Sequence, residues 1–295
     1  MDKEFLMGNN DWLMRSKADS ELPTSISPRL RKQLVMTAMK NAYEFYSAFF
    51  DFPITHHDFD KLALDYEHAQ AHAKSLGLFA PGGIRENDHL NLWCLSNVLS
   101  PEVYVESGVF IGSSLHALMS SPRIKQIYAI DPSLSNLKIP RESIPGKTEY
   151  IEDRDFSQIA FDVSGMSTLV YFDDHIDTAK RIIQASEKGF SYLLFDDSTG
   201  MEGICQRLYP AIPTIPMILN AEILSAGEEL SWTFNRSIRV KLTITEDLIT
   251  SCFRAKALIR KCEPLPNLGL FLPQTNPQPV VDTGKFLVEL AKAGH

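Results

Sequence analysis

Residues 103–131 constrain the fold of this chain more than any other stretch. Val103–Val105 is a short apolar run rich in β-branched residues, which is typical of a buried strand. Glu106 stands where this strand should end. Gly108 and Gly112 follow with three residues between them, so a glycine turn comes directly after the strand.

The residues after the turn complete one βαβ unit. Ser113–Met119 predicts the start of a helix, and Gln126–Ile130 predicts a second strand that ends at Asp131. Glycine lets the backbone approach a ligand without a Cβ in the way, and the start of a helix offers unpaired N–H groups. A carboxylate at the tip of the second strand can accept hydrogen bonds from two ribose hydroxyls. The unit therefore predicts a site for a nucleoside-bearing ligand.

The glycine spacing argues against two familiar phosphate-binding turns. A dinucleotide fingerprint needs Gly-x-Gly-x-x-Gly, whereas this turn has Gly-x-x-x-Gly with Glu106 ahead of it. A P-loop ends in Gly-Lys-Ser or Gly-Lys-Thr, whereas Gly112 is followed by Ser113 and Ser114. Fewer glycines and more acids indicate a ligand without a phosphate.

The run from Glu106 to Ser114, with Asp131 at the end of the next strand, resembles the first two motifs of class I S-adenosylmethionine-dependent methyltransferases. The resemblance covers roughly residues 100–200. It implies that the glycine turn passes under the methionine part of the cofactor and that Asp131 holds its ribose. It also implies an acid near the adenine after a third strand, here Asp155. The residues that the resemblance assigns to S-adenosyl-L-methionine are Glu106, Gly108, Gly112, Ser113, Asp131 and Asp155.

Further strands deliver more acids to the same region. The expected strands are Thr148–Glu152, Ser167–Phe172 and Tyr192–Phe195. The last two end in acid pairs, Asp173-Asp174 and Asp196-Asp197. Because ligands bind at the carboxyl ends of parallel strands, we expect these acids to gather at one sheet edge. Such a crowd requires compensation by the cofactor sulfonium, by a divalent cation or by a proton.

The acid pairs resemble one branch of the family, the metal-dependent macrocin O-methyltransferases, with which the cephalosporin hydroxylase-like proteins share the arrangement. That branch usually carries Asp-Gly-Asp after the fourth strand, whereas Phe172 stands at the first of these positions here. The resemblance implies a Mg²⁺ held by Asp174, Asp196 and Asp197, since hard divalent cations prefer oxygen ligands. Asp174 and His175 are the candidate catalytic residues, which would take the proton of a substrate hydroxyl.

The rest of the chain predicts a helical region ahead of the sheet. Helical spacing and caps predict helices over residues 28–50, 58–75 and 86–99. We therefore assign residues 1–100 to a helical cap or dimerisation region. Residues 101–295 form the expected cofactor-binding domain. The fold class is α/β, with a Rossmann-like doubly wound, mostly parallel sheet. Residues 231–244 predict strands, as the last antiparallel pair of this sheet, and residues 280–293 predict a terminal helix. The Gly-containing stretch 199–203 predicts a loop over the site.

The composition of the chain limits the classes of molecule that it is expected to bind. The net charge of −8 disfavours a broad nucleic-acid footprint, and no apolar stretch reaches the length of about 18 residues expected of a membrane span. The four cysteines show no Cys-x-x-Cys spacing, which fits a reducing cytoplasm. We expect a cytoplasmic homodimer that acts on a small molecule, without a nucleic-acid or membrane partner.

The function expected from the sequence is O-methylation of a hydroxyl on a small molecule, such as a sugar or a natural-product intermediate. Two alternatives remain open. The same scaffold could carry hydroxylase-like or other tailoring chemistry, because one fold hosts many reactions. The chain could also be a non-catalytic cofactor-binding protein, an alternative that Phe172 keeps open.

Overall fold

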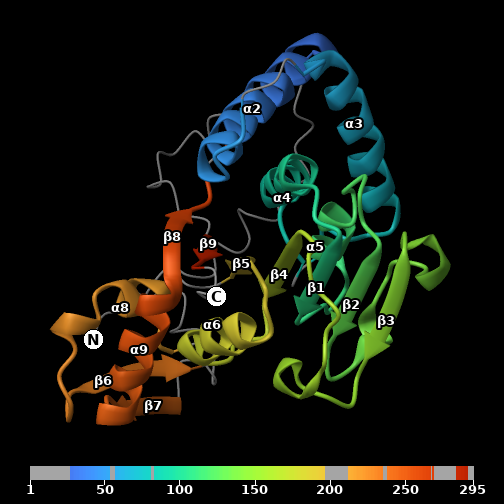
Figure 1. Ribbon diagram of the computed structural model, residues 1–295. Coiled ribbons are helices and arrows are strands. Elements are labelled where there is room, and N and C mark those ends of the chain that lie inside the picture. Colours follow the sequence, from blue (N-terminus) through green and yellow to red (C-terminus); the bar gives the residue numbers. More distant parts are fainter. Residues whose placement is uncertain are drawn as a thin grey trace, which may run out of the picture.

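The computed structural model describes residues 27–53, 57–80, 83–196, 212–234, 238–266, 268 and 284–291 (Figure 1). Its centre is a seven-stranded sheet. The strands are β1 (Val103–Ser107), β2 (Gln126–Ile130), β3 (Lys147–Ile151), β4 (Thr168–Phe172), β5 (Tyr192–Phe195), β8 (Ile259–Pro264) and β9 (Phe286–Leu290).

The strand order is β3-β2-β1-β4-β5-β9-β8. Strands β1 to β5 are parallel, β9 is antiparallel to β5, and β8 is antiparallel to β9. The chain runs outward from β1 to β3 and then returns to the other side of β1 to form β4. This reversal is the switch point of a doubly wound sheet, beside which ligands bind. The predicted Rossmann-like α/β fold is confirmed.

Side chains alternate between the two faces of the sheet, because successive residues of a strand point to opposite sides. In β1, Tyr104 packs in one hydrophobic cluster, whereas Val103 and Val105 pack in the other. In β4, Tyr171 faces the first cluster and Phe172 the second. Both faces are apolar, as expected of parallel strands that are covered on both sides.

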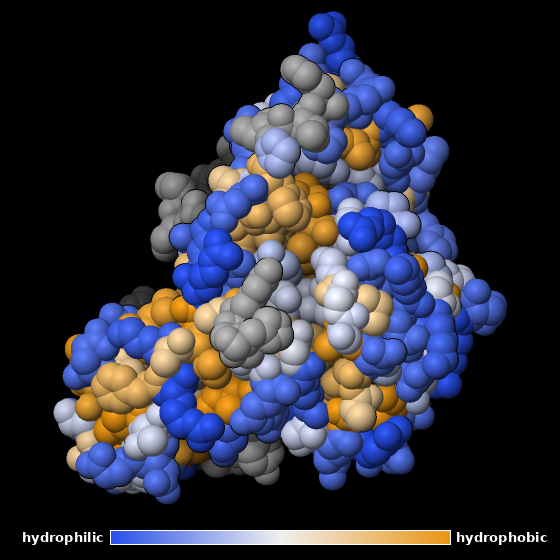
Figure 2. Space-filling model, viewed as in Figure 1, coloured by the Kyte–Doolittle hydropathy of each residue, from blue (hydrophilic) through white to orange (hydrophobic). Residues whose placement is uncertain are grey.

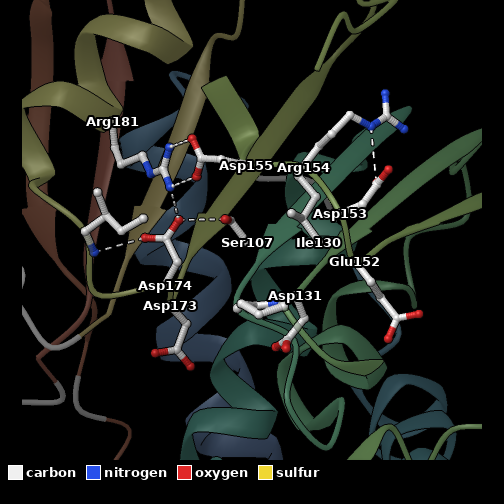
Figure 3. Close-up of a pocket in the computed structure, with 13 residues that line it drawn as sticks. Ser107, Ile130, Asp131, Glu152, Asp153, Arg154, Asp155, Asp173, Asp174 and Arg181 are labelled. Atoms are coloured by element: carbon white, nitrogen blue, oxygen red, sulfur yellow. Dashed lines mark hydrogen bonds and ion pairs between the residues drawn. The ribbon is translucent and has the colours of Figure 1, made fainter. Parts of the chain in front are cut away.

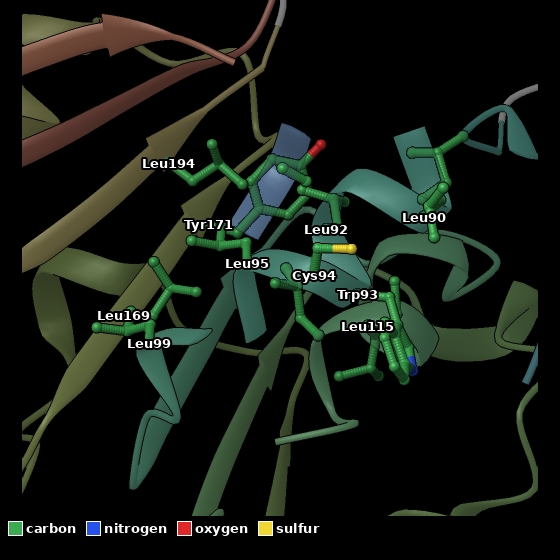
Figure 4. Close-up of a cluster of buried hydrophobic side chains, with 14 of the residues drawn as sticks. Leu90, Leu92, Trp93, Cys94, Leu95, Leu99, Leu115, Leu169, Tyr171 and Leu194 are labelled. Carbon is green, nitrogen blue, oxygen red and sulfur yellow. The ribbon is translucent and has the colours of Figure 1, made fainter. Parts of the chain in front are cut away.

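The first face is covered by α4 (Glu86–Leu99) and α5 (Ser113–Leu118), with α2 (Pro28–Phe49) and α3 (Phe59–Ser75) beyond them. Figure 4 shows side chains of α4 packed over residues of β4 and β5. Helices α2 and α3 meet near their N-terminal ends, where Lys32 lies 2.8 Å from Asp60, and then diverge toward the sheet (Figure 1). In Figure 2 the tip of this pair is hydrophilic and apolar residues gather beneath it. The expected domain boundary falls between α4 and β1.

The second face is covered by α6 (Thr178–Glu187), α8 (Ile215–Leu219) and α9 (Glu246–Leu258), which contribute buried residues to the second cluster. Two strands, β6 (Glu229–Phe234) and β7 (Ile238–Thr243), pair with each other in a separate small sheet. None of the described helices is long and apolar enough to cross a membrane.

Two predictions about the C-terminal part are wrong. Strands do form between 229 and 243, but they do not join the main sheet; its antiparallel pair is β8 and β9. The helix predicted for 280–293 is also wrong in the part that is described, because Phe286–Leu290 forms β9. Leu287, Val288 and Leu290 are buried between β5 and β8, so pairing within the sheet overrides the weak helical spacing. The predicted loop at 199–203 lies outside the described residues.

Three histidines connect the helices of the first face. His72 Nδ1 of α3 lies 3.0 Å from His116 Nε2 of α5, and His116 Nδ1 lies 3.0 Å from His89 Nε2 of α4. Burial is the main cause that lowers the pKa of His89 to about 3 and that of His116 to about 4. Both side chains are therefore neutral in the folded protein near neutral pH.

We expect the protein to lose stability in mild acid. The unfolded chain binds protons on His116 near pH 6.5, whereas the folded chain does so only near pH 4, so the free energy of unfolding is highest above pH 6.5 and falls between these values. His116 alone should account for a fall of about 3 kcal/mol. Urea unfolding across this pH range tests the expectation. His116→Gln should remove its share of the dependence and leave that of His89, whereas His68→Gln, at an exposed position of α3, should leave the whole dependence unchanged.

Candidate functional site

A cavity of about 450 Å³ lies at the carboxyl ends of β1, β2, β3 and β4, beside the switch point (Figure 3). This volume is within the usual range of small-molecule sites. Its lining is dominated by polar and charged side chains and by the glycine turn. The lining residues are Ser107, Gly108, Ile130, Asp131, Pro132, Glu152, Asp153, Arg154, Asp155, Asp173, Asp174, Ile176 and Arg181.

The glycine turn comes close to the end of β4. Gly108 has a φ of +95°, and a Cβ at this position would lie 2.4 Å from the carbonyl oxygen of Asp173. Only glycine combines this backbone conformation with the close approach. The turn thereby forms one wall of the cavity without a side chain that would fill it.

Asp131 holds the same turn from the end of β2. Its Oδ2 accepts hydrogen bonds of 2.9 Å from the backbone N–H groups of both Val109 and Phe110, and its Oδ1 accepts one of 2.8 Å from Ser133. A carboxylate has about four acceptor positions, so these bonds leave about one for a ligand. Glu152 lines the cavity beside it and accepts from Leu134 N–H at 2.8 Å. Two carboxylates therefore line this part of the cavity.

Arg181 joins two of the lining acids. Its guanidinium donates to both oxygens of Asp155, at 3.0 and 2.5 Å, and lies 2.8 Å from Asp174 Oδ2. Ser107 Oγ donates to the same oxygen of Asp174 at 2.6 Å (Figure 3). The Arg181 side chain is 1% exposed, and its charged group lies 5.6 Å from the ring centres of Phe156 and Phe172.

The charges of this cluster stabilise one another. Hydrogen bonds from Arg181 hold the pKa of Asp155 well below its usual range. Burial alone would lower the pKa of Arg181, but the hydrogen bonds and charges of Asp155 and Asp174 outweigh it and raise this pKa. The cluster therefore pairs one buried guanidinium with two acidic side chains.

The acid after β5 lies in a second cluster. Asp196 Oδ1 lies 2.8 Å from the ammonium of Lys285, and Asp196 Oδ2 accepts a hydrogen bond of 2.6 Å from Tyr171. Tyr171 packs in the first hydrophobic cluster, whereas Phe156 and Phe172, which flank Arg181, pack in the second. The acids predicted to gather at one place are thus divided between the two faces of the sheet.

The predicted metal ligands do not converge in the described part of the chain. Asp174 pairs with Arg181 and Asp196 with Lys285, while Asp197 lies outside the described residues. Among the described residues, no group of three or more His, Cys, Asp or Glu side chains could hold a metal ion. The described donor set does not fit Mg²⁺. The expected compensating charge is instead supplied by the two basic side chains.

Three of the residues predicted to bind the cofactor stabilise the turn rather than line the cavity. Glu106 is fully buried and accepts from Tyr104 and from Ser114 Oγ, the latter at 2.7 Å, and burial raises its pKa to about 8. A Cβ on Gly112 would lie 2.6 Å from Leu137 Cδ1, and Ser113 Oγ donates to the Leu78 carbonyl. Their contacts with a cofactor stay predictions.

His175 lies beside the other member of its acid pair. Its Nε2 is 3.4 Å from Asp173 Oδ1, and its φ is +55°, in the left-handed region. Asp174, the predicted partner in proton transfer, has both oxygens engaged, since Oδ1 accepts from Ile176 N–H at 3.2 Å and Oδ2 contacts Ser107 and Arg181. The catalytic roles of Asp174 and His175 stay predictions.

Three residues of these clusters did not emerge from the sequence as site residues: Arg181, Glu152 and Lys285. A signal for Arg181 was present. It stands on the buried face of α6 together with Thr178, Ile182 and Ala185, and a charged residue on an apolar helical stripe indicates a buried partner. Lys285 had no such signal, because the strand that positions it was predicted as a helix.

No protein-family model matches this sequence, and no curated protein matches it. Among solved structures, it is similar to an O-methyltransferase from Bacillus cereus in complex with SAH, at 10% identity over 86% of this chain and 100% of that chain, with a TM-score of 0.39. It is similar to a SAH-bound methyltransferase from Podospora anserina, at 14% identity over 96% and 97% of the two chains, with a TM-score of 0.40. CmcI with Mg-SAM aligns with only 37% of this chain and 50% of its own, at 23% identity and a TM-score of 0.27. At such values the similarities do not identify the activity.

We expect removal of the Arg181 charge to destabilise the protein. Arg181→Met leaves two carboxylates without their cation. We expect the free energy of unfolding to fall by about 3 kcal/mol, which is the lower end of the range for a broken buried ion pair. The lower end applies because Asp155 is partly exposed. Lys180→Met, which removes an exposed charge one residue earlier on α6, should cost less than about 1 kcal/mol. Urea unfolding of both variants measures the difference. Equal costs would show that the ion pair does not hold this edge of the sheet.

Proposed function

We propose that this protein is an S-adenosylmethionine-dependent methyltransferase that transfers the methyl group to a hydroxyl of a small molecule. The observation that supports this most is the cavity beside the switch point, which combines a glycine wall at Gly108 with a carboxylate at the end of β2, Asp131. The described lining of the cavity includes no glycine-rich cradle for a pyrophosphate. It suits a nucleoside whose other half carries no phosphate.

Each part of the cavity matches a part of such a cofactor. Asp131, assisted by Glu152, would accept the ribose hydroxyls. Asp155 is held in place by Arg181 and by its own cap on the following 3₁₀ turn, and in this proposal it would lie beside the adenine. The N–H groups of Val109 and Phe110 are already bonded to Asp131, which pre-organises the turn before any ligand enters.

The chemistry asks mainly for positioning. The bound cofactor supplies an activated methyl group, and the protein aligns it with the acceptor oxygen for an in-line displacement. We assign removal of the acceptor proton to His175, with Asp173 as the group that orients its ring, because Asp174 is occupied by Arg181 and Ser107. The proposed acceptor is therefore a hydroxyl that reaches the carboxyl end of β4.

Calorimetry with S-adenosylhomocysteine, and with NADH as a control, tests the proposed cofactor. We expect S-adenosylhomocysteine to bind and NADH not to bind. Absence of S-adenosylhomocysteine binding would remove the basis of the proposal. Binding without methyl transfer to any of a broad panel of hydroxylated acceptors would instead favour a non-catalytic cofactor-binding protein, and a product that gains one oxygen would indicate hydroxylase-like chemistry.

Asp131 provides the sharpest test of the ribose position. Asp131→Ala should weaken S-adenosylhomocysteine binding about ten- to a hundredfold, since a hydrogen bond to a charged group contributes about 1.5–3 kcal/mol. Asp162→Ala, which removes an exposed carboxylate on the loop after Asp155, should bind as the wild type does. Because Asp131 also holds the turn, thermal unfolding of the variant distinguishes a local loss of binding from a loss of fold. Unchanged affinity in a folded Asp131→Ala protein would place the ribose elsewhere.

A further inference from the structure

The Lys285 ammonium is enclosed by acids at the carboxyl end of the sheet. Its side chain is 6% exposed and lies 2.8 Å from Asp196 Oδ1. The negative charges of Asp196, Asp88 and Asp173 all act on it, and together they raise its pKa although burial alone would lower it. Asp173 also lines the candidate cofactor cavity, so the cluster borders that cavity.

The register of the sheet fixes this ammonium in place. Phe195 of β5 pairs with Phe286 of β9 in antiparallel register. The next residues outward, Asp196 and Lys285, therefore stand opposite each other as a cross-strand pair. On the other side, the Lys285 carbonyl accepts a hydrogen bond of 2.9 Å from Leu265 N–H at the end of β8. Lys285 is thus bonded to the end of β8 through its backbone and to Asp196, after β5, through its ammonium.

We propose that Lys285 is a resident cation that takes the place of a divalent metal ion at the carboxyl ends of β4 and β5. The positive charge that a dication would bring to these acids is brought by this side chain, which pairs directly with Asp196. Asp196 then has a positive partner without Mg²⁺.

The ammonium also excludes a metal ion from the same carboxylate. A dication coordinated by Asp196 would lie within a few ångströms of a buried positive charge, where water screens repulsion weakly. The second oxygen of Asp196 accepts from Tyr171, whose hydroxyl would have to turn away. The Lys285 side chain is 6% exposed and its backbone is bonded to the end of β8, so the ammonium is held beside Asp196.

A titration with Mn²⁺, followed by electron paramagnetic resonance, tests the proposal, because Mn²⁺ takes the same oxygen ligands as Mg²⁺. The wild-type protein should show no saturable Mn²⁺ binding that depends on Asp196. Saturable one-to-one binding that disappears in Asp196→Asn would overturn the proposal. This measurement does not depend on whether any lysine variant folds.

Removal of the ammonium gives the complementary result. Lys285→Met should bind Mn²⁺ at least about tenfold more tightly than the wild type, a difference of about 1.4 kcal/mol. The metal should also raise its unfolding temperature. Lys188→Met, which removes a partly buried lysine on the opposite side of the sheet, should gain neither property. A folded Lys285→Met protein with wild-type Mn²⁺ affinity would contradict the proposal.

The inference is independent of the proposed methyl transfer. S-adenosylhomocysteine binding, measured on the same wild-type samples with and without Mg²⁺, separates the two. We expect the affinity to be the same in both conditions. Absence of S-adenosylhomocysteine binding in both conditions would remove the proposed function and leave the assignment of Lys285 intact. An affinity for S-adenosylhomocysteine that depends on Mg²⁺, with this dependence abolished in Asp196→Asn, would overturn the assignment of Lys285 and leave the proposed function intact.

Discussion

The candidate site depends on the pairing of Arg181 with Asp155 and Asp174. This one guanidinium joins the loop after β3, the end of β4 and helix α6, three segments that would otherwise bring two like charges close together. Two aromatic rings flank it and exclude water, which strengthens each of its charge interactions. The same burial makes the ion pair costly to break, because Asp174, which is mostly buried, would be left without its cation. The shape of the cavity wall follows from this ion pair.

The central fold could be predicted because it rests on local patterns. The apolar runs of β1, β2, β4 and β5 are uninterrupted and flanked by turns, as parallel strands covered on both faces must be. Gly108 and Gly112 mark the turn because both adopt a positive φ with neighbours packed against them. These constraints act within a few residues of the chain. They can be recognised without knowledge of what lies across the sheet.

The edge of the sheet could not be predicted in the same way. Residues 286–290 become a strand because β5 and β8 lie on either side of them, and β8 is separated from β9 by more than twenty residues of sequence. Neither partner is visible in the local pattern, which alternates weakly and also permits a helix. The error extends to the site, since the position of Lys285 opposite Asp196 follows only from the register of β9 on β5.

The described acids do lie at one edge of the sheet, as predicted. The prediction did not foresee that they divide between the two faces of the sheet. Asp173 and Asp174 follow the end of β4 and both line the cavity, but their side chains have different partners. Asp174 turns to Arg181 on the face of α6, whereas Asp173 lies near Tyr171 and Lys285 on the face of α4. Each face then carries its own buried cation. Two adjacent acids at the end of a strand are thus better interpreted as one charge partner on each face of the sheet than as two ligands of one metal ion. The cation that balances each acid has to be sought in the helices and strands that cover its face.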